Sequence, residues 1–195
     1  MFALDGSRDL RPEGFVLVKN SINTILDSLT ISPRDSQVGV LEYSDKANIA
    51  FHLNQNRNVK DVKEAIQNIQ PSLGAARVTD EALKSVAMEM FAARNGALPG
   101  VPKVFVLFTS GKSTGSQPLR EAATALREHG VMTYVVGIGK RVDRDELVGL
   151  VPGGEDVLLL IDQPDHLPGV VPDIIRSILN HTPKSKFKRS PRVVN

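Results

Sequence analysis

The side chains best suited to bind a ligand lie in two polar segments, each of which follows an apolar run. Asp5, Ser7 and Asp9 come after the first apolar run of the chain, and Ser110 follows the run 103–109. Hard cations such as magnesium are bound by oxygen atoms that several loops bring together in near-octahedral geometry. The first segment could supply three such oxygens. A capped turn before a helix is the alternative, because Asp, Ser and Gly favour turns on their own account.

The elements that would position these side chains follow from the spacing of apolar residues. Recurrence at three and four residues predicts helices, and alternation or a continuous apolar run bounded by turn residues predicts strands. The predicted helices span residues 12–29, 59–69, 83–91, 119–129, 143–150 and 167–179. The predicted strands span residues 2–4, 38–43, 47–53, 103–109, 131–138 and 157–161.

Strands and helices alternate, with one hairpin over residues 38–53. This order predicts an α/β fold with a doubly wound, mainly parallel six-stranded sheet, one antiparallel edge strand and helices on both faces. Such sheets bind ligands beyond the carboxyl ends of their strands, where the strand order reverses. If the first and fourth strands are neighbours, the Asp5–Asp9 loop and Ser110 share one crevice.

The 195 residues suit one domain, predicted over 1–182, followed by a basic linker or tail over 183–195. The tail holds five cations and no acid, so the rest of the chain carries about three net negative charges. This balance gives no basic nucleic-acid-binding face. No apolar run is long enough to cross a membrane, so no membrane insertion is expected. Without a visible signal peptide, the chain is interpreted as a piece of a longer protein.

Residues 2–179 resemble the von Willebrand factor type A domain. Besides the Asp-x-Ser start, the resemblance rests on the segments 38–44, 100–107 and 130–139 and on the helix over 143–150. It implies a doubly wound fold with a metal-ion-dependent adhesion site made from Asp-x-Ser-x-Ser, a distant Thr and a distant Asp. Within the family, the sequence is most similar to modules of extracellular-matrix proteins, above all the N-terminal type A modules of collagen VI.

The adhesion-site positions depart from the family pattern in three places. Asp9 stands where the family has its final Ser, and Arg77 aligns with the distant Thr. Ser110 stands at the distant Asp. Two of the five positions, Asp5 and Ser7, match the motif. The resemblance therefore implies a degenerate adhesion site.

Two interpretations of Arg77 stay open. Its guanidinium could lie near Asp5 and Asp9 and replace the cation with charge-assisted hydrogen bonds, because two close carboxylates need a positive partner. It could instead be a solvated loop residue. An alignment shifted by one or two residues would make Thr79 the ligand. We expect no metal and no other cofactor; any metal would be held by Asp5, Ser7, Asp9 and Thr79.

Other chemistries have weaker signals. The chain has no Gly-x-Ser-x-Gly, no phosphate loop and no identifiable Ser-His-Asp arrangement, so an enzyme is not expected. A hydrolase or phosphatase that uses Asp5 would still need a general base or a phosphate cradle. The four histidines lack the spacing of zinc ligands: His52, His129, His166 and His181.

Two features near the C-terminus concern modification. Asn180 begins a glycosylation sequon, which Pro183 would make less favourable. The segment Lys186–Arg189 could be a dibasic processing site, although a solvated linker is the simpler interpretation.

The expected function is that of a secreted, non-catalytic interaction module in the extracellular matrix. The resemblance implies a collagen VI-like chain that acts in microfibril assembly or cell–matrix adhesion. Its partners would be matrix proteins such as collagens and neighbouring type A modules, with acidic polysaccharide as a further partner of the basic tail. The alternative is a cation-dependent adhesion module that binds magnesium through a non-standard site.

Overall fold

A computed structural model describes residues 1–151 and 157–181, so the predicted tail lies outside the described residues. The strands are β1 (Phe2–Asp5), β2 (Val40–Tyr43), β3 (Ala47–Phe51), β4 (Lys103–Thr109), β5 (Val131–Ile138) and β6 (Val157–Ile161). The α-helices are α1 (Arg11–Asp27), α2 (Val59–Asn68), α3 (Thr79–Ser85), α4 (Leu119–Glu128), α5 (Arg144–Leu150) and α6 (Leu167–His181). No helix in this part of the chain is long and apolar enough to cross a membrane.

The six strands form one sheet in the order β3-β2-β1-β4-β5-β6. All neighbouring pairs are parallel except β2 and β3, which form an antiparallel hairpin at one edge. The predicted six-stranded, mainly parallel sheet with one antiparallel edge strand is confirmed. The chain leaves β1 toward β2 on one side and later returns to β4 on the other. The strand order therefore reverses beside β1, where such sheets bind ligands.

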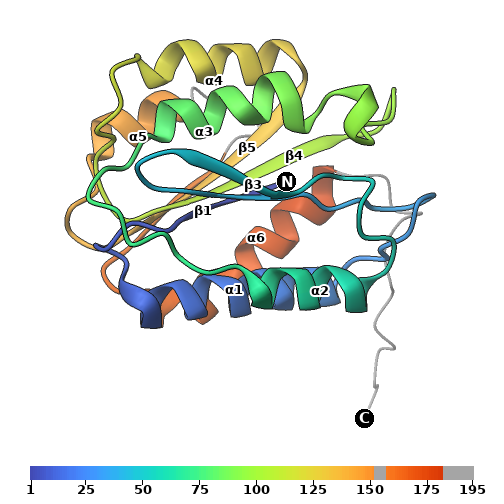
Figure 1. Cartoon of the computed structure of the whole chain (residues 1–195), viewed down its shortest axis with the longest axis horizontal. Coiled ribbons are helices and arrows are strands. Elements are labelled where there is room, and N and C mark those ends of the chain that lie inside the picture. The colour runs from blue at the N-terminus through green and yellow to red at the C-terminus, as the bar shows by residue number, and fades with distance from the viewer. Residues whose placement is uncertain (152–156, 182–195) are drawn as a thin grey trace.

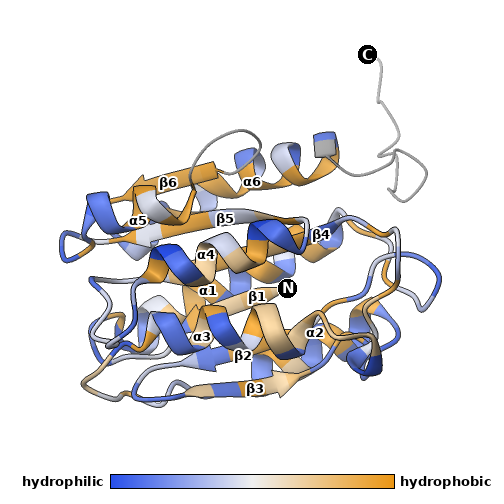
Figure 2. Ribbon diagram, turned by 90° about the horizontal axis from the view of Figure 1, so that it is seen from above, coloured by the Kyte–Doolittle hydropathy of each residue, from blue (hydrophilic) through white to orange (hydrophobic). Residues whose placement is uncertain are grey.

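Helices cover both faces of the sheet, with α1, α2 and α6 on one face and α3, α4 and α5 on the other (Figure 1). Successive strand residues point to opposite faces, so one buried strand contributes side chains to the hydrophobic cores on both faces of the sheet. In β4, Val106 and Phe108 pack toward α1 and α6, whereas Phe105 and Leu107 pack toward α3 and α4. Figure 2 shows hydrophobic colour along the strands and hydrophilic colour on outward turns of the helices.

Most predicted elements begin and end within two residues of the observed ones. The exception is the helix predicted over residues 83–91, which begins earlier, at Thr79, and continues beyond Ser85 as a π-helical turn over Val86–Met90. Its buried side chains Leu83, Val86 and Met90 keep the apolar face that the spacing predicted. Apolar spacing locates that face, but it does not distinguish an α-helical turn from a π-helical one.

A buried lysine joins α1 to α2, two of the three helices on one face of the sheet. Lys19 of α1 is 6% exposed, and burial lowers the pKa of its ammonium group. The ammonium donates to the carbonyl oxygens of Gln67 (2.8 Å) and Ile69 (3.1 Å) at the C-terminus of α2. It also lies 5.6 Å from the centre of the Phe15 ring. Carbonyls at a helix C-terminus have no partner within the helix, so Lys19 supplies one.

Replacing Lys19 by methionine should therefore destabilise the domain. Lys19→Met keeps an unbranched side chain against Phe15 but leaves the two carbonyls without this donor, a loss of about 1–2 kcal/mol. The matched control is Lys63→Met, because Lys63 pairs with Asp27 at 2.6 Å in an exposed contact. Such pairs contribute less than about 1 kcal/mol. Urea unfolding of both variants measures the difference, and equal losses would contradict the capping role.

Candidate functional site

The carboxyl ends of two neighbouring strands bring the predicted site residues together. Asp5 is the last residue of β1, and Ser110 directly follows β4, the strand beside it. After β1 the chain turns sharply, because the backbone N–H of Ser7 donates to Asp5 Oδ1 at 2.9 Å. This bond closes a turn inside the loop, but no side chain caps α1, the helix that follows. Asp5, Ser7 and Ser110 are all buried in this crevice.

The Asp5 carboxylate receives four hydrogen bonds. Besides the Ser7 N–H on Oδ1, its Oδ2 accepts from the Ser110 N–H (2.7 Å), the Ser110 hydroxyl (2.7 Å) and Arg77 Nε (2.9 Å). Both oxygens are therefore bound by groups of this chain, which is why a fully buried Asp5 carboxylate is tolerated here.

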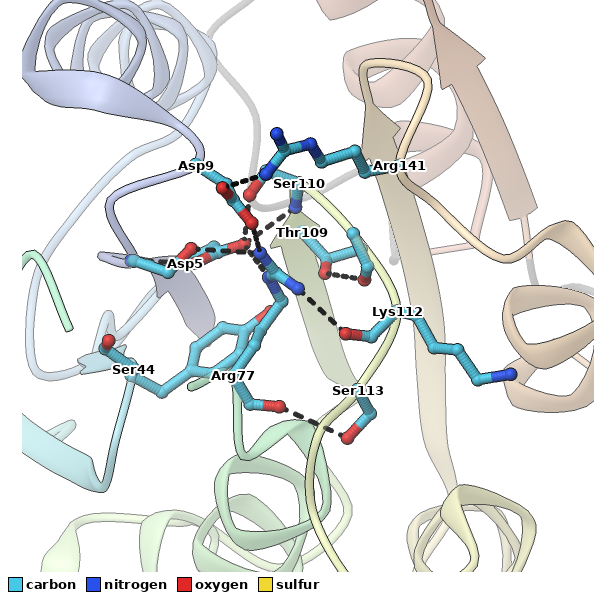
Figure 3. Close-up of polar contacts among 12 residues, drawn as sticks. Asp5, Asp9, Ser44, Arg77, Thr109, Ser110, Lys112, Ser113 and Arg141 are labelled. Carbon is cyan, nitrogen blue, oxygen red and sulfur yellow. Dashed lines mark hydrogen bonds and ion pairs between the residues drawn. The ribbon is translucent and has the colours of Figure 1, made fainter. Parts of the chain in front are cut away.

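The Arg77 guanidinium lies at the centre of the cluster, between the carboxylates and the loop after β4 (Figure 3). Nη2 donates to Asp9 Oδ2 at 2.6 Å and, over a longer 3.3 Å, to the Ser7 hydroxyl. Nη1 donates to the carbonyl oxygen of Lys112 at 2.8 Å. One side chain therefore joins the loop after β1, its own loop and the loop after β4.

The backbone of Arg77 is fixed as firmly as its side chain. Its N–H donates to the Thr114 hydroxyl (2.7 Å), and its carbonyl accepts from the Thr114 N–H (2.9 Å) and the Ser113 hydroxyl (3.2 Å). Gly111 makes room for the guanidinium, since a Cβ there would lie 2.7 Å from Nη1. A larger residue at 111 would therefore displace Arg77.

The charges of the cluster balance. Asp9 is bound on its second oxygen by Arg141 Nη1, so two carboxylates face two guanidinium groups. Burial works to lower the pKa of Arg77, but the charge of Asp5 and the bonds with Asp9 and Asp5 raise it above its usual range. Arg77 is 4% exposed, whereas the Arg141 side chain is 74% exposed. The inner pair is buried and the outer pair is open to solvent.

Tyr43 forms part of the floor below the cluster. It is fully buried at the end of β2, and its hydroxyl donates to the carbonyl oxygen of Phe108 at 3.2 Å. Burial and the negative charge of Asp5 raise the pKa of Tyr43 well above its ordinary value. The phenol therefore stays protonated and acts as a donor, not as a base.

Glu42 of β2 contacts both the loop after β1 and the segment that leads to Arg77. Its carboxylate accepts from the Ser72 hydroxyl (2.8 Å), the Ser72 N–H (3.1 Å) and the Asn48 amide (3.0 Å). It lies so close to Gly6 that a Cβ at residue 6 would be 1.8 Å from Oε1. The loop after β1 and the segment leading to Arg77 thus rest on the same buried carboxylate.

The remaining predicted residues do not join this cluster. Thr79 is buried at the start of α3 and makes no hydrogen bond with Asp5, Ser7 or Asp9. Asn180 is exposed on α6, but its sequon partner at position 182 lies outside the described residues, as does the segment 186–189. Among residues 1–151 and 157–181, no three His, Cys, Asp or Glu side chains are placed to hold a metal ion.

Sequence reasoning did not identify Arg141, the Lys112 carbonyl or Glu42. Arg141 lies three residues beyond the end of β5, and β5 is the next strand beside β4. The rule that ligands bind at carboxyl ends of parallel strands could have drawn attention to it. The Lys112 carbonyl carries no signal in the residue types, because a backbone oxygen is present at every position.

Comparison with known proteins identifies the family of this domain. The model of the von Willebrand factor type A domain matches residues 1–163. The chain belongs to this family. In the type A pattern set out above, the aspartate that ends β1 begins the adhesion site, and Asp5 occupies that place here. In this type A domain the Arg77 guanidinium lies among Asp5, Ser7 and Asp9.

Several matrilins and a mussel matrix protein are similar to this chain. Matrilin-1 of Gallus gallus is 40% identical over 147 residues, which cover 75% of this chain and 29% of that protein. Matrilin-1 of Homo sapiens is 36% identical over 147 residues, with the same coverage. This type A chain thus spans less than a third of these relatives. Proximal thread matrix protein 1 of the mussel byssus superposes with a TM-score of 0.85 at 26% identity, over 91% of this chain and 46% of that one.

Removing the guanidinium of Arg77 should lower the free energy of unfolding far more than removing that of Arg141. Arg77→Gln leaves a buried carboxylate without its partner, a loss of about 3–5 kcal/mol. Arg141→Gln removes an exposed contact to the same Asp9, a loss of less than about 1 kcal/mol. Denaturant unfolding of the two variants measures both losses. Similar small losses would contradict the role of Arg77 as the residue that closes the crevice.

Proposed function

We propose that this chain is a non-catalytic protein-interaction module of the extracellular matrix whose adhesion site is degenerate. Arg77 takes the place that a divalent cation has in the family, so the domain binds its partners without one. The site residues of this proposal are Asp5, Ser7, Asp9, Arg77 and Ser110. No cofactor is part of it.

The observation that carries the proposal is the Arg77 guanidinium bound to the Asp5 carboxylate. Both carboxylate oxygens accept hydrogen bonds from this chain, and Arg77 adds a fixed positive charge beside them. A magnesium ion is held largely by carboxylate charge and oxygen ligands. To enter here it would have to displace a guanidinium that makes hydrogen bonds to Asp5, Asp9 and the Lys112 carbonyl. That exchange breaks several charge-assisted bonds for each ion bound.

The matrix setting is supported by the matrilins among the relatives and by the mussel matrix protein. It implies a secreted protein with matrix proteins, such as collagens, and neighbouring type A modules as partners. More specifically, we propose that the module belongs to a collagen VI-like chain of the alpha-3 type. The residues that flank this segment in the full-length protein test it, since further type A repeats or a long Gly-x-y tract would identify the setting.

A cation-dependent adhesion module is the second candidate. One structure of the mussel matrix protein, with the same TM-score of 0.85, is described as having a zinc-occupied adhesion-site motif. A type A domain similar to this chain therefore holds a metal at that site. Arg77 argues against the same behaviour here, because its charge would oppose the ion at short range.

A hydrolase or phosphatase that uses Asp5 receives no support. A nucleophilic carboxylate needs a free lone pair and access to substrate. Asp5 is fully buried, and both of its carboxylate oxygens accept hydrogen bonds from groups of this chain. The proposal therefore keeps a binding function for this crevice.

Magnesium binding tests the proposal directly. Millimolar magnesium should leave the melting temperature of the wild-type chain unchanged, because only an ion that binds the native state raises stability. The double variant Arg77→Thr, Ser110→Asp should gain a saturable rise. It removes the blocking cation and restores a carboxylate opposite Asp5.

The two single variants are the controls for this experiment. Ser110→Asp alone would pair with Arg77, and Arg77→Thr alone leaves too few carboxylates, so neither should bind magnesium. Calorimetry with magnesium, manganese and calcium on all four proteins gives the affinities. A saturable shift in the wild type would overturn the proposal in favour of the second candidate.

Partner binding should survive chelation. Pull-downs of collagen VI fragments and neighbouring type A modules should give the same yield in excess chelator as in magnesium, since no partner contact passes through a metal ion. The basic segment 184–195 could add a salt-sensitive attraction to acidic polysaccharide. Comparing the full chain with one ending at residue 183 separates that contribution. Complete loss of partner binding in chelator would show that a cation is needed.

A further inference from the structure

An open polar pocket lies directly outside the closed cluster. It has a volume of about 510 Å³ and is lined by Arg8, Asp9, Arg11, Ala75 and Arg141. Three of the five lining residues are arginines, which come from the loop after β1, the start of α1 and the loop after β5. Three parts of the chain therefore line the pocket: residues 8–11, Ala75 and Arg141.

The pocket carries a surplus of positive charge. Its single carboxylate, Asp9, is already bound by Arg77 on one oxygen and by Arg141 on the other. Arg8 and Arg11 are exposed, and neither forms an ion pair with any residue in the described part of the chain. Two guanidinium groups therefore have donors to offer to an incoming anion.

The backbone around the pocket is held in an unfavourable conformation. Arg11 has a φ of 60°, in the left-handed region that side chains other than glycine rarely adopt. Leu73, two residues before Ala75, has a φ of 55°. The two loops are tied to each other by hydrogen bonds from Leu73 N–H to the Gly6 carbonyl (2.7 Å) and from Arg8 N–H to the Gly74 carbonyl (3.1 Å). Such strain persists where the surroundings impose it, and it often marks binding sites.

We propose that this pocket binds the carboxylate of an acidic side chain from a protein partner, with Arg8 and Arg11 as the main donors. Guanidinium groups form two-pronged, charge-assisted bonds with carboxylates, which suits an anion entering between them. This inference rests on the proposed function and deepens it, because it names the chemistry that a cation-free site recognises. Arg141 also lines the pocket, and the N–H groups that it does not use for Asp9 can donate to the same carboxylate.

The surroundings favour a single carboxylate over a sulfated chain. An extended polyanion needs a row of unpaired cations, whereas this pocket includes the Asp9 carboxylate in its lining, and the nearby Lys112 is paired with Asp143 at 2.8 Å. The loop that contains Ala75 also exposes an apolar side chain, Leu73, which is 45% exposed. An acidic residue next to an apolar one in a partner protein would match this combination of charge and apolar surface.

The test uses the 195-residue chain in excess chelator. The probe is a blocked hexaglutamate peptide, with hexaglutamine as its uncharged match and a heparin-derived oligosaccharide as the sulfated alternative. Calorimetry at two salt concentrations measures affinity, and amide shifts of residues 8–11 and 75 in NMR spectra locate binding. We expect saturable binding of hexaglutamate, none of hexaglutamine, and shifts centred on these residues.

Two double variants decide the test. The pocket variant combines Arg8→Gln with Arg11→Gln, and the control variant combines Arg34→Gln with Arg57→Gln. Both pairs remove two positive charges from exposed arginines, but only the first lies in the pocket. The first pair should weaken hexaglutamate binding at least about tenfold, the loss expected from one charge-assisted bond. The control pair should change it less than about twofold.

Each contrary outcome has a distinct meaning. Equal weakening by both pairs, binding of the oligosaccharide alone, or no binding of hexaglutamate would overturn the carboxylate pocket. Those results would leave the cation-free site standing, since that proposal depends on the magnesium response of the wild-type chain. A melting-temperature rise of the wild type in magnesium would instead overturn the cation-free site itself.

Discussion

The buried contact between Arg77 and Asp5 is the interaction on which the rest of this site depends. Removing two charges from water is costly, and the attraction between them offsets that cost only when the other hydrogen-bonding sites are also satisfied. Here both Asp5 oxygens accept hydrogen bonds, and the Arg77 guanidinium donates to Asp5, Ser7, Asp9 and the Lys112 carbonyl. Three loops from different parts of the sequence are thereby fixed to one side chain.

A guanidinium in this place differs from a metal ion in two physical respects. It is covalently attached, so no change in the surrounding solution removes it, and its donors are fixed in one plane. A metal ion can keep an open position for an oxygen atom of a partner, whereas Arg77 has its donors directed inward to atoms of its own chain. In the proposed function, recognition at this end of the sheet uses the groups outside the cluster, where Arg8, Arg11 and Arg141 line the pocket.

The fold could be predicted from the sequence because apolar spacing reports buried faces, and the buried strands are short and bounded by turn residues. The neighbouring positions of β1 and β4, on which the crevice depends, were only a condition of the sequence argument, and the structure shows that it is met. Arg77 was reached only through the family alignment, since an arginine in a loop has no pattern of its own. The pocket could not be predicted, because it depends on the left-handed backbone at Arg11 and on loop pairing that residue types do not encode.

Asp9 explains why the closed cluster and the outer pocket are one system. Its two carboxylate oxygens are divided between the buried Arg77 and the exposed Arg141. A serine at this position, as in the family motif, would leave the two guanidinium groups with only Asp5 to balance them. The added carboxylate at Asp9 and the added cation at Arg77 are therefore complementary. With Asp9 fully engaged on both sides, the charge of Arg8 and Arg11 is not neutralised from within the site and remains directed to solvent.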